Sequence, residues 1–146
     1  MKTTSFLFLS LFTISAMAED WPTYRHDGKR TAFSAEDMPS AVFPQWTFVP
    51  RHAPKTAWPL PGEETPRMHS DRALHVIVAG RTAYFGHSVD DNIYALDTRT
   101  GETKWTFRAE GPVRFAPVFD GGRIYFGSAD GYAYCLNAAD GTLVGR

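Results

Sequence analysis

The sequence predicts an all-β fold, and three observations lead to this expectation. The stretch HVIVAGRTAYFG, residues 75–86, returns 41 residues later as APVFDGGRIYFG, residues 116–127. Within each copy, short segments rich in Val, Ile, Tyr and Phe alternate with glycine turns, giving about four strands per repeat. No apolar stripe with a helical period is long enough for a helix. Four antiparallel strands in about 40 residues form one propeller blade. We therefore expect a partial β-propeller of four-stranded antiparallel blades, with an incomplete ring.

The first element along the chain is an export signal, residues 1–18. Lys2 precedes the apolar run FLFLSLFTI, and Ala16-Met17-Ala18 supplies the small residues before a signal peptidase site. The run is too short and too interrupted to cross a bilayer, which needs roughly 20 apolar residues. We expect cleavage after Ala18, no membrane insertion, and a periplasmic or extracellular mature protein. The formal net charge of −1 gives no electrostatic reason to bind nucleic acid.

Residues 19–49 are expected to form an N-terminal segment with part of a blade. The sequence QWTF at 45–48 is echoed by KWTF at 104–107, at a spacing of 59 residues. The spacing exceeds the repeat period because residues 50–71 intervene. This stretch is rich in proline and has no period, so we interpret it as an insertion or linker.

Two blades are expected next, one in residues 72–112 and a second, truncated one in residues 113–146. The motif YALDTRTG at 94–101 returns as YCLNAADG at 134–141. An Asp or Asn can accept hydrogen bonds from N–H groups two residues ahead, and the closing glycine can adopt a positive φ. Apolar residues on both strand faces fit a blade between two neighbours. The repeated structural motif comprises Tyr94, Leu96, Asp97, Gly101, Trp105, Tyr134, Leu136, Asn137 and Gly141.

These repeats resemble the PQQ-like (quinoprotein) β-propeller repeat, in which V-Y-x-G precedes D-G-x-x-Y-A-L-D-x-x-T-G-x-x-x-W. The first copy matches at 83–86, 94–101 and Trp105, and the second at 124–127, 130–131, 134–137 and Gly141. The stretch DWPTYRHDGKRTAFS, residues 20–34, is similar to the opening of many exported members. The resemblance covers residues 20–48 and 72–146.

The resemblance implies roles that the residues alone do not. The tryptophan after the T-G turn packs between adjacent blades in this family, which assigns Trp105, and more weakly Trp46, to blade docking. The second copy departs from the pattern, with Gly145 at the tryptophan position. Members similar to calcium- and PQQ-dependent alcohol dehydrogenases oxidise small alcohols, whereas others bind no quinone and act as scaffolds. PQQ and Ca²⁺ are therefore implied by the resemblance only.

No catalytic or metal-binding residues are expected from motifs in this chain. The histidines show no metal-ligand spacing, although His69 with Asp71 or His75 could be brought together; the set is His26, His52, His69, His75 and His87. Cys135, the single cysteine, is predicted to be a small buried core residue. Asp90-Asp91-Asn92 is interpreted as a hairpin turn and not as a calcium loop. Phosphate-loop, dinucleotide and nucleophile-elbow motifs do not occur.

Two functional hypotheses follow. The 128 residues left after cleavage cannot close a ring of 4 to 8 blades, so we expect the N-terminal piece of a larger exported propeller. Its partners are then the remaining blades of a longer chain or a separate protein. The first hypothesis is a binding or scaffold module without catalytic residues of its own. The alternative is a fragment of a PQQ-dependent oxidoreductase acting on alcohols or sugars, and whether the chain is an enzyme stays open at this point.

Overall fold

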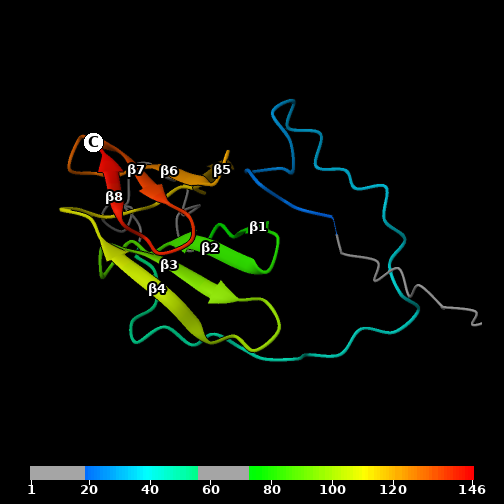
Figure 1. Cartoon of the computed structure of the whole chain (residues 1–146). Coiled ribbons are helices and arrows are strands. Elements are labelled where there is room, and N and C mark those ends of the chain that lie inside the picture. Colours follow the sequence, from blue (N-terminus) through cyan, green and yellow to red (C-terminus); the bar gives the residue numbers. More distant parts are fainter. Residues whose placement is uncertain (1–18, 56–72) are drawn as a thin grey trace, which may run out of the picture.

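The computed structural model of the protein describes residues 19–55 and 73–146. The predicted signal peptide at 1–18 and most of the proline-rich stretch at 50–71 lie outside the described residues. In the described part the strands form two four-stranded antiparallel sheets, which Figure 1 shows lying one beside the other. This arrangement confirms the predicted fold class, a partial all-β propeller.

Each sheet is one blade, with its strands in chain order. Blade 1 has the order β1-β2-β3-β4 and consists of β1 (Ile77–Ala79), β2 (Thr82–Gly86), β3 (Asn92–Asp97) and β4 (Thr103–Arg108). Blade 2 has the order β5-β6-β7-β8 and consists of β5 (Val118–Asp120), β6 (Arg123–Gly127), β7 (Ala133–Asn137) and β8 (Leu143–Gly145). Both blades have a register shift at the same repeat position, between Ala95 and Leu96 and between Cys135 and Leu136.

One row of directly opposed residues crosses each sheet on the same face. In blade 1 the row is Ile77, Tyr84, Ala95 and Trp105, which we call the covered row. In blade 2 the equivalent row is Val118, Tyr125, Cys135 and Gly145, which we call the open row. The covered row belongs to a buried cluster with Ile124, Phe126, Tyr134 and Leu136 of blade 2. The core therefore lies between the two blades.

The turn between the third and fourth strand is built alike in both blades. The Asp97 carboxylate accepts hydrogen bonds from the backbone N–H of Arg99 at 2.9 Å and of Thr100 at 3.2 Å. In blade 2 the side-chain oxygen of Asn137 accepts one from the N–H of Ala139 at 2.9 Å. Such side-chain acceptors satisfy turn N–H groups that no strand partner reaches.

The two blades approach each other most closely at their innermost strands. Among the strands of the described residues, β1 and β5 are the one pair from different sheets whose backbones lie in contact. The N-terminal segment also joins them: Trp21 pairs with Val78 next to Ile77, and the N–H of Phe119 donates to the carbonyl of Pro22 at 2.8 Å. Residues 20–23 therefore link the inner edges of both blades.

The N-terminal segment then leaves the blades and returns. Figure 1 shows the chain between about residues 30 and 44, drawn in blue to cyan, running outside the two sheets before it comes back along blade 1. Phe33, Met38, Val42 and Phe43 are all exposed on this stretch. No helix in the described part of the chain is long and apolar enough to span a membrane.

Candidate functional site: two seams and an open face

Trp105 fills the seam between blades 1 and 2. Its side chain is 9% exposed, and its indole N–H donates to the carbonyl of Ala138 in blade 2 at 3.0 Å. The Tyr84 hydroxyl donates to the same carbonyl at 3.1 Å, with the two rings 5.7 Å apart. The carbonyl of Ala138 in blade 2 therefore binds side chains from two strands of blade 1, β2 and β4.

The indole of Trp105 lies directly on Gly141. Gly141 has φ of +74°, and a Cβ at this position would lie 2.6 Å from Cε3 of Trp105. A side chain here would meet both the ring and an unfavourable backbone conformation. The glycine that closes the second turn is thus required by the tryptophan of the preceding blade as well as by its own turn.

A second seam repeats this contact on the other face of blade 1. The indole of Trp46 lies on Gly101, whose φ is +75°, and a Cβ there would lie 2.7 Å from Cδ2 of Trp46. The indole N–H of Trp46 donates to the carbonyl of Thr98 at 2.8 Å. Trp46 therefore contacts the turn of blade 1 as Trp105 contacts the turn of blade 2.

Each seam contains its own cluster of three aromatic rings, arranged in the same way. In the first seam Phe107 lies 6.3 Å from Phe126 and 5.8 Å from Tyr134, measured between ring centroids. In the second, Phe48 lies 5.0 Å from Phe85 and 5.4 Å from Tyr94. The two rings within each blade are stacked in both cases, with interplanar angles of 4° and 15°.

A tyrosine and an aspartate clamp the second hairpin of each blade. Tyr94 donates its hydroxyl to Asp90 at 2.5 Å, and Tyr134 donates to Asp130 at 2.6 Å. Burial, followed by the contact with Asp90, raises the pKa of the Tyr94 hydroxyl. The hydrogen bond to Asp130, followed by burial, raises the pKa of Tyr134. Both hydroxyls donate to their aspartates in the neutral form.

His87 takes part in the second seam, and among the described residues it belongs to no group of metal ligands. It is fully buried, and its Nε2 donates to the carbonyl of His52 at 3.0 Å. Ser128, its counterpart in blade 2, donates its hydroxyl to the carbonyl of Gly111 at 2.9 Å. These bonds connect the start of each blade's second hairpin to the chain that leads into the blade.

The predicted motif residues occupy corresponding places in the two blades. Asp97 and Asn137 accept turn hydrogen bonds, Gly101 and Gly141 lie under tryptophans, and Tyr94 and Tyr134 clamp hairpins. Leu96 and Leu136 are buried at 1% and 0% exposure. Trp105 extends from its own blade to contact Ala138 and Gly141 of the next, and Tyr134 of that blade packs against Phe107, so several of the motif residues meet at the seam.

The open row is exposed where its blade 1 counterpart is buried. Val118 is 40% and Tyr125 is 39% exposed, whereas the equivalent Ile77 and Tyr84 are 0% and 3% exposed. The difference arises because blade 2 covers the row of blade 1, while no further sheet among the described residues covers the row of blade 2. The open row is therefore an apolar face with the pattern of a seam.

The prediction that Cys135 is a buried core residue is wrong for this structure. Cys135 is a partly exposed free cysteine, whereas Ala95 at the equivalent position is fully buried. Both residues point to the same face of their blades, and only the face of blade 1 is covered. The sequence pattern identified the strand and its apolar face, but it could not show whether a neighbour covers that face.

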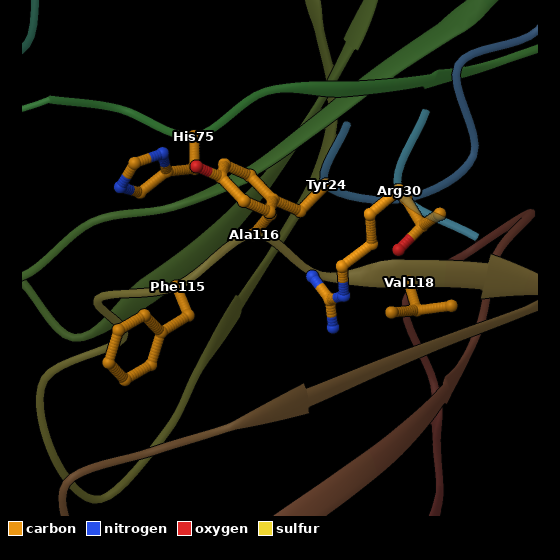
Figure 2. A pocket seen from close by; sticks show the side chains of 7 residues that line it. Tyr24, Arg30, His75, Phe115, Ala116 and Val118 are labelled. Atoms are coloured by element: carbon orange, nitrogen blue, oxygen red, sulfur yellow. The ribbon is translucent and has the colours of Figure 1, made fainter. Parts of the chain in front are cut away.

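A pocket of about 500 Å³ lies beside the inner strands (Figure 2). Tyr24 and Arg30 come from the N-terminal segment, His75 from the chain before β1, and Phe115 and Val118 from around the start of β5. The Arg30 guanidinium lies 5.8 Å from the ring centroid of Tyr24, and the rings of Tyr24 and His75 are also 5.8 Å apart. The pocket thus places a cation next to an apolar floor, and Val118 of the open row forms part of that floor.

The loop that carries Tyr24 and Arg30 has an unusual backbone. Four of its residues other than glycine have positive φ, namely Arg25, His26, Arg30 and Ala32. The Asp27 carboxylate holds the loop by accepting from the N–H of Thr31 at 3.0 Å and from its hydroxyl at 2.8 Å. These bonds, the backbone one first, lower the pKa of Asp27. The sequence gives no signal for this loop, because positive φ is uncommon in residues such as arginine and alanine.

The structure groups no metal ligands in its described part. No cluster of three or more His, Cys, Asp or Glu side chains occurs there. His69 and Asp71, which were considered together with His75, lie outside the described residues. Asp90 accepts hydrogen bonds from the N–H of Asn92 and from Tyr94, and Asp91 has a φ of 60° within the turn.

Residues 44–144 match the PQQ_2 family model, which is described as outer membrane protein assembly factor BamB. A search of curated protein sequences gives no match. Among solved structures, the chain is similar to quinohemoprotein alcohol dehydrogenase from Comamonas testosteroni, with 23% identity and a TM-score of 0.61 over 86% of this chain and 19% of that one.

Two further structures match smaller parts of the chain. BamB from Moraxella catarrhalis matches with 23% identity and a TM-score of 0.42, over 45% of this chain and 20% of that one. A europium-containing methanol dehydrogenase matches with 22% identity and a TM-score of 0.44, over 52% and 16% of the two chains. The likeness to the Comamonas protein supports the fold alone. The chain spans about a fifth of the length of these structures.

Proposed function

Because the chain belongs to the PQQ_2 family of PQQ-like propeller repeats, we propose that it contributes blades to an exported propeller that serves as a binding or scaffold module. The observation that carries the proposal is the open row. Its residues repeat the pattern of a buried seam and are exposed or partly exposed in the described structure. The proposal assigns this face to a further blade of a longer chain.

The chemistry of the described residues supports a module without catalysis of its own. The polar side chains of the repeats take part in turns and hairpin clamps, as Asp97, Asn137, Tyr94 and Tyr134 illustrate. Each is therefore accounted for by a structural bond. The family description names an outer membrane protein assembly factor, so the partner class that we propose is a protein of that assembly process.

Export is part of the proposal. Residues 1–18 carry the charged start, apolar run and small-residue cleavage pattern of a signal peptide. Fractionation of cells that produce the protein, with N-terminal sequencing, should find it outside the cytoplasm with Glu19 as its first residue. An intact Met1 in the cytoplasmic fraction would contradict export.

The alternative function is a quinoprotein oxidoreductase, which the likeness to an alcohol dehydrogenase makes worth testing. PQQ with Ca²⁺ would need a set of oxygen donors around the metal, usually including carboxylates. The described residues do not fit this requirement, since they contain no group of three or more His, Cys, Asp or Glu side chains. This function would therefore depend on residues outside the described part.

The two functions are separated by one assay on the protein as its gene encodes it. The protein is supplied with PQQ and Ca²⁺, and dye reduction is followed with alcohols and sugars. We expect no turnover above a control without quinone, and no change in quinone absorbance on mixing. Turnover that requires both PQQ and substrate would replace the scaffold proposal with the oxidoreductase.

A further inference from the structure

We infer that the amino group created by signal-peptide cleavage forms an ion pair with Glu36, and that this pair fixes the N-terminal segment against blade 1. The inference rests on the proposed export, in which Glu19 becomes the first residue of the mature chain. It goes beyond that proposal because it gives the new amino group a structural role. The pair involves only residues that the structure describes.

The backbone nitrogen of Glu19 lies at a carboxylate. Its N–H donates to Oε1 of Glu36 at 2.8 Å. While Ala18 is attached, this nitrogen belongs to a neutral amide. After cleavage it belongs to an α-amino group, which is mostly protonated at pH 7 because its ordinary pKa is about 7.7 to 8.0. Cleavage therefore places a positive charge at hydrogen-bond distance from the Glu36 carboxylate, with no need for the nitrogen to move.

The side chain of Glu19 has partners of its own, which leaves Glu36 as the partner of the amino group. The Ser34 hydroxyl donates to Oε2 of Glu19 at 2.5 Å, and Nε2 of His26 lies 3.3 Å from Oε1. These contacts, the Ser34 bond first, hold the pKa of the Glu19 carboxyl below its ordinary value. The Ser34 oxygen also accepts from the N–H of Glu36 at 3.1 Å, which holds Glu36 beside residue 19.

The cavity beside residue 19 is lined by acidic side chains. Its titratable lining consists of His26 and four carboxylates, namely Glu19, Asp20, Asp27 and Asp120. Among the described residues, no lysine or arginine lines this cavity. A positive charge at the start of the chain is therefore attracted by several carboxylates, and His26 is the one lining group that can carry a charge of the same sign.

The pair lies directly before the stretch that joins the two blades. Trp21 and Val78 of β1 exchange two backbone hydrogen bonds, of 2.8 and 2.9 Å. The ring of Trp21 also lies edge-on to that of His26, with the ring centroids 4.8 Å apart. Residue 19 is thus bonded to Glu36 two positions before a residue that is bonded to blade 1. Fixing residue 19 limits the ways in which Trp21 can separate from Val78.

The exposure of the pair sets the size of its effect. Both partners lie at the surface, and exposed charge pairs change an equilibrium by no more than about fivefold. The pair therefore stabilises the docked N-terminal segment locally, and the blades do not depend on it for folding.

The reactivity of the amino group tests the pair on the mature protein at the length its gene encodes. Acetic anhydride reacts with the unprotonated amine, so a pair that favours the ammonium slows acetylation at pH 7. We expect Glu36→Gln to speed acetylation of the α-amino group about two- to fivefold, read by mass spectrometry of the N-terminal peptide. Glu102→Gln is the matched control, because the Glu102 side chain contacts Thr100 instead. An unchanged rate in Glu36→Gln overturns the inference.

A version that retains Ala18 as its first residue tests whether the position of the charge matters. It keeps the amide of Glu19 and moves the ammonium back by one residue, about 3.8 Å along the chain. We expect Glu36→Gln to change its acetylation rate by a clearly smaller factor. The amides of Trp21 and Val78 should exchange with solvent about two- to fivefold faster than in the chain that begins at Glu19. Equal acetylation effects in the two versions overturn the ion pair, and equal exchange overturns its effect on docking.

The first residue of the exported protein tests the proposed export separately. If N-terminal sequencing finds Glu19 and Glu36→Gln speeds acetylation, both ideas are supported. If it finds Glu19 and Glu36→Gln has no effect, export stands and the ion pair alone is overturned. A different first residue overturns cleavage after Ala18 and the ion pair together.

Discussion

The covered row and the open row are the same four positions of a repeat in two different surroundings. Ile77 and Tyr84 are almost fully buried, whereas Val118 and Tyr125 are about two-fifths exposed. Their strands, registers and bulges correspond. The pattern within a repeat therefore determines the sheet, while the burial of each face depends on the neighbouring blade.

The largest expected effect is that of removing the tryptophan of the covered row. Trp105→Ala should lower the free energy of unfolding by about 3 to 5 kcal/mol, because a large ring is lost from a closed seam. Trp46→Ala should cost clearly less, since Trp46 is only partly buried in the described structure. Urea denaturation followed by circular dichroism measures both. Equal losses would mean that the second seam is as closed as the first.

The next effect compares an aliphatic residue from each row. Ile77→Ala should cost about 2 to 5 kcal/mol, since its side chain is fully buried. Val118→Ala should cost less than about 1 kcal/mol while the open row stays exposed. Measured in the protein at its gene-encoded length, a larger loss for Val118→Ala would show that a neighbour covers the row. An equally small loss there would argue against a covering blade.

Substitution of two glycines compares the turn that Trp105 covers with the open row. Gly141→Ala should cost about 1 to 3 kcal/mol, because it combines a positive φ with a Cβ 2.6 Å from the Trp105 ring. Gly145→Ala meets no atom within 4 Å and should change stability by no more than about 0.5 kcal/mol. Thermal melting of the two variants checks this. A large effect at Gly145 would point to a covered open row.

The smallest effect concerns acid stability and the turns of the two blades. The N–H of Arg99, then that of Thr100, and the charges of Lys104 and Arg81 hold the pKa of Asp97 below its ordinary value. The stabilisation that these contacts give to the folded state is present above the pKa of Asp97 in the unfolded chain. It is lost as the pH falls through the lower pKa that Asp97 has in the folded protein.

Asn137, the counterpart of Asp97 in blade 2, does not titrate. Asp97→Asn should therefore flatten the loss of stability below about pH 4, the ordinary aspartate range, and slightly lower stability at pH 7. Urea midpoints measured from pH 2 to 7 test this. If the urea midpoint depends on pH in the same way in Asp97→Asn as in the unchanged protein, the turn does not contribute to acid unfolding.

Much of the fold could be predicted from local pattern. The repeats at 75–97 and 116–137 contain the first three strands of each blade, and the closing residues Gly101 and Gly141 have the positive φ that their turns require. These features depend on residues close together in the sequence, for which propensity and spacing are informative.

The features that could not be predicted depend on distant or absent neighbours. Cys135 was expected in the core because its strand pattern is apolar, yet only a covering blade would bury it. The positive φ of Arg25 and His26 arises in a loop fixed by tertiary contacts, including the bond from Phe119 to Pro22. For the second seam, the echo of QWTF in KWTF was visible, but the contact of Trp46 with Gly101 required the structure.

The packing between blades 1 and 2 affects the number of blades that a closed ring can hold. The backbones meet at the innermost strands β1 and β5, while the outer strand β4 is held off blade 2 by the indole of Trp105. The two blades therefore diverge from their inner to their outer strands, and the size of the aromatic side chains packed between them sets the angle between the blades. Since the angles around a closed ring must sum to a full turn, the side chain at this position helps to determine how many blades the circle holds.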